Sequence, residues 1–166
     1  MKNFLFSALS LLTFSAALAQ DFSTTQDMQK REGFQTLYFD EMNDKVYLEV
    51  NRLDEDILHV ASLSSGVGSN DIGLDRGQLG PQRVVRFSKI GNRIFLIQPN
   101  LDYRGSSSNP SEIKSITQAF ASSVLYGFDI VESLEGRYLI DLTPFLFQDA
   151  HGVADRLASR GQGTYN

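Results

Sequence analysis

The chain has 166 residues, a formal net charge of −5 and no cysteine. This length is sufficient for one ordinary domain with a buried core, and the lack of cysteine excludes disulfides, thiolate metal sites and a cysteine nucleophile. The lysines and arginines are scattered along the chain rather than gathered in a basic stripe, which argues against nucleic acid as a partner.

The first 19 residues have the architecture of a secretory signal peptide. Lys2 supplies the charged start, an apolar run covers residues 4–18, and Ala17 and Ala19 offer a small-x-small cleavage site before Gln20. The run is shorter than the ~20 residues that a membrane anchor requires, and it ends in small residues. We therefore expect an exported protein, periplasmic or extracellular, with no membrane span after removal of the signal.

The next segment, residues 20–32, is polar and lacks a sustained periodicity. This composition predicts a mobile leader ahead of a fold that begins at Gly33. Three strands are then expected, at residues 34–39, 45–50 and 57–63, because apolar and β-branched side chains alternate there with polar ones.

Residues 64–81 contain five glycines between polar side chains, a composition typical of loops that carry sites. The directed polar groups of this loop belong to Asn70, Asp71, Asp75 and Arg76. We expect them to cap neighbouring elements, to pair with one another or to contact a partner domain rather than to touch substrate, because polar groups in a loop must first be satisfied.

A β-hairpin is expected at residues 83–88 and 93–98, around a tight turn formed by Gly91 and Asn92. Both faces of the return strand are apolar. That strand should therefore be covered on both sides and lie centrally in its sheet.

A helix is expected at about residues 110–126. Asn109 is a suitable N-cap, Pro110 fits the first helical position, and Gly127 is a suitable stop. Apolar side chains at helical spacing predict that one face of this helix packs on the sheet; they are Ile113, Ile116, Phe120 and Val124.

A second hairpin is expected at residues 128–132 and 137–142, followed by a short helical piece that opens at Thr143 and by a last helix at about residues 153–159. The order of the elements predicts an α+β fold. It should contain a mainly antiparallel β-sheet, one packed helix and short C-terminal helices.

Four segments resemble a known family: residues 69–78, 83–87, 98–104 and 149–157. From about Gly33 onward the chain resembles the amino-terminal region, of unknown function and of the DUF5117/DUF5118 type, of secreted bacterial zinc-dependent metalloproteases. In that family the zinc-binding His-Glu-x-x-His helix lies far downstream, and this sequence lacks the motif. The resemblance implies that residues 33–166 are an accessory domain from a longer protein, with zinc only in a C-terminal peptidase domain.

Two histidines are the candidate imidazole ligands or bases, and neither has a second ligand at helical spacing. We expect His59 to pack within its strand and His151 to make local hydrogen bonds at a helix start. The sequence therefore predicts no catalytic, cofactor-binding or metal residue. A hydrolase that uses Asp75 with His151 is the remaining enzymatic alternative.

The leading hypothesis is a non-catalytic scaffold or substrate-facing platform. Its partners would be the peptidase domain that the resemblance implies and a protein or peptide substrate. The alternative is a free-standing periplasmic or secreted binding module, which holds a protein or glycan partner with the loop at residues 64–81 and an exposed sheet edge.

Overall fold

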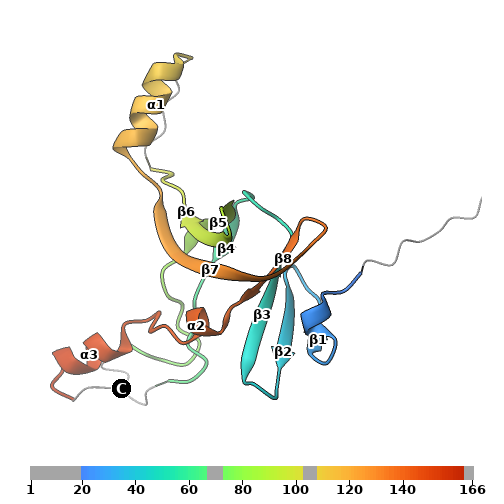
Figure 1. The fold of residues 1–166 in the computed structure, drawn as a ribbon. Coiled ribbons are helices and arrows are strands. Elements are labelled where there is room, and N and C mark those ends of the chain that lie inside the picture. The colour runs from blue at the N-terminus through green and yellow to red at the C-terminus, as the bar shows by residue number, and fades with distance from the viewer. Residues whose placement is uncertain (1–19, 67–72, 103–107, 163–166) are drawn as a thin grey trace, which may run out of the picture.

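The computed structural model describes residues 20–66, 73–102 and 108–162. Their eight strands form one sheet in the order β1-β2-β3-β8-β7-β6-β5-β4, which curls into a half-barrel (Figure 1). All neighbouring strands are antiparallel. The expected signal peptide lies outside the described residues, and no helix within them is long and apolar enough to cross a membrane.

The described elements follow one another along the chain in this order: η1 (Ser23–Thr25), β1 (Gln29–Arg31), β2 (Thr36–Asp40), β3 (Lys45–Val50), β4 (Ile57–His59), β5 (Arg83–Ile90), β6 (Arg93–Gln98), α1 (Pro110–Ala119), β7 (Ser123–Leu134), β8 (Arg137–Asp141), α2 (Thr143–Leu146) and α3 (Val153–Ser159). The mainly antiparallel sheet is thus confirmed. Because strands dominate and the helices are short, the α+β prediction is only roughly right.

The hairpin formed by β5 and β6 is confirmed, with Gly91 at φ 59° in its turn. The return strand β6 lies between β5 and β7, as its two apolar faces predict. Ile94 and Leu96 are buried on one face, whereas Phe95 and Ile97 are partly buried on the other. The main core contains these two buried side chains together with Leu48, Val50, Val85, Phe87, Phe128 and Ile140.

The amino-terminal segment belongs to the fold, so the prediction of a mobile leader at residues 20–32 is wrong. Phe22 is fully buried and meets the Tyr38 ring edge-on at 6.4 Å between centroids, while β1 pairs with β2. The Glu132 carboxylate on β7 accepts four hydrogen bonds of 2.7–3.0 Å from the amides and hydroxyls of Ser23 and Thr24. These polar residues are ordered because they bind a partner on β7. That partner lies far along the chain, so local composition does not reveal it.

The electrostatics of this attachment follow from the same bonds. Burial raises the pKa of the Glu132 carboxyl, but the four hydrogen bonds outweigh that effect and lower the pKa to about 2. On β8, Arg137 donates to the carbonyl of Gln20 and to the buried Glu49 carboxylate. The segment is therefore attached to both strands of the second hairpin.

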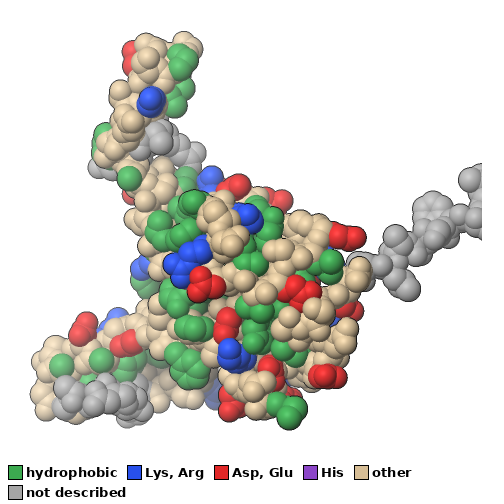
Figure 2. Space-filling view, viewed as in Figure 1, with side chains coloured by type: hydrophobic (Ala, Val, Ile, Leu, Met, Phe, Trp, Pro, Cys, Tyr) green, Lys and Arg blue, Asp and Glu red, His purple; other side chains and the backbone are tan. Residues whose placement is uncertain are grey.

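The helix α1 begins as predicted, because the Asn109 side chain accepts from the Ser111 amide at 3.0 Å. It ends at Ala119 instead of near residue 126, and it stands clear of the body rather than packing on the sheet (Figures 1 and 2). Ile113 is 45% exposed, and Val124, which is 60% exposed, lies in β7 opposite Ile97. Pairing with β6 overrides the helical spacing of the apolar residues.

The buried amino-terminal segment generates a stability prediction. The Phe22→Ala substitution should lower the free energy of unfolding by about 3–5 kcal/mol, because it opens a cavity in a packed aromatic cluster. Phe147→Ala is the matched control, since Phe147 is 85% exposed and its loss should change stability by no more than about 0.5 kcal/mol. Chemical denaturation measures both. Equal effects of the two substitutions would contradict the burial of this segment.

Candidate functional site

A cleft of about 460 Å³ lies between residues 59–63 and residues 145–153, and we call it the edge cleft. All five residues of the first segment line it. Because successive residues of an extended chain point to opposite faces, a cleft lined by all five follows the edge of the strand rather than one face. This edge belongs to β4 and its continuation, at the end of the sheet in the described part of the chain.

The backbone of this edge is partly unpaired. The Ala61 carbonyl accepts from the Gly80 amide at 2.8 Å, and the Leu63 amide donates to the Gln78 carbonyl at 3.1 Å. Residues of an antiparallel ladder alternate in the direction of their backbone groups. The amide and carbonyl of Ser62 therefore point away from the partner segment, toward the open edge.

The strand predicted at residues 57–63 is regular only as far as His59, and beyond it Ser62 forms an isolated antiparallel bridge with Leu79. The paired segment reaches back into the glycine-rich loop. The described end of that loop thus contributes to the site by supporting the edge.

The wall opposite the edge is anchored by Phe145 on α2. Its ring lies 5.4 Å from the ring of Tyr126, 5.8 Å from that of Phe128 and 5.9 Å from that of His59. The start of α2 is fixed because the Thr143 hydroxyl accepts from the Val46 amide at 2.9 Å. The aromatic core therefore sets the position of the cleft wall.

Both histidines line the edge cleft. Each has one ring nitrogen that is shielded from solvent and has no hydrogen-bond partner among the described residues: Nδ1 of His59 and Nε2 of His151. Burial lowers the pKa of His59, and the charge of Arg83 lowers it further. The start of α3 is capped by Asp149, which accepts from two backbone amides, so the local role predicted for His151 is taken by its neighbour.

A smaller hollow of about 140 Å³ adjoins the edge cleft and shares His59, Ala61 and Phe145 with it. Arg83 lines this hollow directly opposite His59 in the ladder of β4 and β5. Its guanidinium makes no hydrogen bond or ion pair to any described residue. Sequence reasoning missed Arg83, and only the strand register would have placed it beside His59.

The described polar residues predicted in the glycine-rich loop lie outside the edge cleft. Asn70 and Asp71 fall outside the described residues, while Asp75 and Arg76 are exposed and do not line the edge cleft. No hydrogen bond joins Asp75 to His151, so the geometry gives no support to a hydrolase built on that pair. Of the described candidates, the two histidines line the cleft.

The described end of this loop is held against α3. Leu74 is buried together with Leu157, and Arg156 donates to the Gly73 carbonyl at 3.1 Å. These contacts fix the segment that pairs with residues 61–63, and they also fix the helix that follows Asp149.

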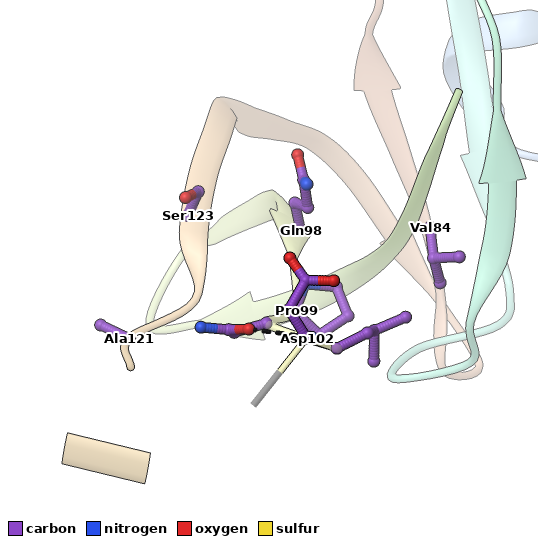
Figure 3. A pocket seen from close by; sticks show the side chains of 8 residues that line it. Val84, Gln98, Pro99, Asp102, Ala121 and Ser123 are labelled. Carbon is purple, nitrogen blue, oxygen red and sulfur yellow. Dashed lines mark hydrogen bonds between the residues drawn. The ribbon is translucent and has the colours of Figure 1, made fainter. Parts of the chain in front are cut away.

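A separate hollow of about 280 Å³ opens between the end of β6 and the start of β7 (Figure 3). Gln98, Asp102 and Ser123 line it, and the Asp102 amide donates to the Asn100 side chain at 3.1 Å. It has neither an open strand edge nor a histidine. The edge cleft combines both features, so it is the stronger candidate.

The lowered pKa of His59 generates a pH prediction. Protonation of His59 is harder in the folded chain than in the unfolded chain, so stability should fall as the pH drops through about 6.5. Between pH 7.5 and pH 5.5, the stability of His59→Gln should fall less than that of the wild type. The His151→Gln variant retains His59, so it should keep the part of the fall that His59 causes. Thermal unfolding at each pH measures this, and an unchanged slope in His59→Gln would refute the assignment.

A family model described as "Domain of unknown function (DUF5117)" matches residues 77–166, just over half of the chain. The matched region contains Arg83, Phe145 and His151 from the walls of the two hollows, but not β4. Comparisons with curated proteins and with solved structures found no match. The extent of the family match is decisive: the chain belongs to the DUF5117 family of domains of unknown function.

Proposed function

We propose that this domain binds an extended stretch of polypeptide along its open sheet edge, as a non-catalytic accessory module of an exported zinc-dependent metalloprotease. One observation carries the peptide-binding part: the edge cleft follows residues 59–63 and has a second wall at residues 145–153. A peptide in the cleft would pair its backbone with the outward-pointing groups of Ser62. Such strand addition supplies affinity through main-chain bonds and specificity through side-chain pockets.

The dimensions of the cleft suit this role. A volume of about 460 Å³ is within the range of sites that hold small ligands or a few residues of a peptide. Leu146, which is 55% exposed, follows Phe145 on the same wall and adds apolar surface for a bound chain. Exposed apolar side chains beside an open strand edge are typical of protein-binding surfaces.

The link to a metalloprotease is supported by the sequence resemblance described above. In that arrangement the domain would hold substrate in an extended form for a peptidase domain that carries the zinc ion. The described residues of this chain gather no group of three or more His, Asp or Glu side chains suited to a metal ion. We therefore assign no catalytic step to this domain.

A free-standing binding module for a protein partner is the second candidate. It is favoured by the observation that both walls of the edge cleft belong to this one chain. The reading frame downstream of codon 166 distinguishes the two candidates. An uninterrupted frame that carries a His-Glu-x-x-His motif supports the accessory module, whereas a genuine stop codon supports the free-standing module.

The peptide-binding proposal predicts a specific effect at Ser62. The purified chain should bind labelled extended peptides without cleaving them, with or without added zinc. Ser62→Pro removes the outward amide donor and should weaken binding about tenfold or more, since one lost main-chain bond and a blocked edge cost at least about 1.4 kcal/mol. Fluorescence polarisation measures the dissociation constants.

Ser62→Ala is the matched control, because it removes the hydroxyl but keeps the amide, and it should bind as the wild type does. Circular dichroism verifies that the proline variant is folded. Equal affinities of a folded Ser62→Pro variant and the wild type would contradict binding along this edge. Zinc-dependent cleavage by the purified chain would contradict the non-catalytic role.

A further inference from the structure

The joined walls of the edge cleft and its smaller neighbour carry polar nitrogens without a hydrogen-bond partner. Arg83 has no described partner, and Nδ1 of His59 and Nε2 of His151 are shielded and unpaired. Buried polar atoms are nearly always hydrogen-bonded in folded proteins, so unpaired nitrogens from two segments around one cleft require an explanation.

The one carboxylate on these walls is already engaged. Asp149 lines the edge cleft, but its two oxygens accept from the amides of Val153 and Ala154, at 2.8 Å and 3.0 Å. Those bonds lower the pKa of Asp149, which keeps it ionised at the start of α3. Asp149 is therefore not a hydrogen-bond acceptor for the Arg83 guanidinium.

The register places the guanidinium and an imidazole side by side. Arg83 and His59 are directly opposed across β4 and β5, and side chains of such pairs leave the sheet on the same face with Cβ atoms about 5 Å apart. A guanidinium binds a carboxylate through two parallel hydrogen bonds, and an adjacent imidazole adds a third donor when its facing nitrogen carries a proton. This spacing fits a single carboxylate.

We propose that the edge cleft selects extended peptides that carry an acidic side chain, whose carboxylate enters the smaller adjoining hollow and binds Arg83 there, with His59 beside it. The inference rests on the proposed peptide-binding function and names the class of peptide bound. The cleft runs along a strand edge, so the peptide passes through it and presents a side chain rather than its terminus. The chain itself carries a net charge of −5, so this local positive site must overcome a general repulsion of acidic peptides.

Peptides of one extended host sequence provide the test. They are acetylated and amidated, so that no terminal carboxylate contributes, and they differ only in a central Glu, Gln or Lys. The wild-type chain should bind the Glu peptide at least tenfold more tightly than the Gln peptide, and the Lys peptide most weakly. Fluorescence polarisation at fixed ionic strength gives the three dissociation constants.

Substitutions assign the preference to the guanidinium. Arg83→Met keeps the length of the side chain without its charge and should make the Glu and Gln peptides bind equally. Arg83→Glu should reverse the preference in favour of the Lys peptide, a gain that a misfolded variant cannot show. Arg76→Met is the matched control, because Arg76 is exposed and lies outside the cleft, and it should keep the preference for Glu.

A second readout reports on the imidazole. Binding of a carboxylate stabilises the protonated ring, so the pKa of His59 should rise when the Glu peptide is bound and stay constant with the Gln peptide. The charged or titratable groups on the walls around this ring are Arg83, Asp149 and His151. Nuclear magnetic resonance titration of both histidines separates the His59 shift from any shift of His151.

The possible failures separate the two proposals. If the Glu and Gln peptides bind the wild type with equal affinity, the acidic preference is overturned while peptide binding stands. If none of the three peptides binds, both are overturned. If an unblocked Gln peptide with a free terminal carboxylate binds as tightly as the blocked Glu peptide, the cleft recognises a chain end and the proposed side-chain recognition is wrong.

Discussion

The structure depends on the double pairing of β7. The first part of this long strand pairs with β6 and its second part pairs with β8, so one strand joins the two groups of the sheet. Register shifts occur between Leu96 and Ile97 on one side and between Ile130 and Glu132 on the other. Such irregularities bend a strand and increase its twist, which accounts for the curl of the sheet.

That curl determines where the site forms. Phe128 lies on β7 near the end of its pairing with β6, where it is opposite Ile94, and its ring packs against Tyr126 and Phe145. Phe145 in turn brings α2 and the chain that follows it toward the edge at residues 59–63. The position of the edge cleft thus follows from the packing of the core. A preformed cleft of this kind avoids part of the ordering cost of binding.

The local parts of this arrangement follow from the sequence. The turn at Gly91, the cap at Asn109 and the helix at residues 153–159 all depend on neighbouring residues, and all three occur as predicted. The errors arise where distant partners decide the outcome. Glu132 orders the amino-terminal segment from far along the chain, and pairing with β6 draws Val124 out of the expected helix.

The same distinction applies to the site. The sequence identifies His151 as a candidate, but the approach of Arg83 to His59 depends on strand register, which no local pattern encodes. Hydrogen exchange of the Ser62 amide is the sharpest test of peptide binding along this edge. Such binding predicts that this outward-pointing amide becomes protected when an extended peptide is added. Peptide binding that leaves the Ser62 amide as exchangeable as in the free protein would contradict it.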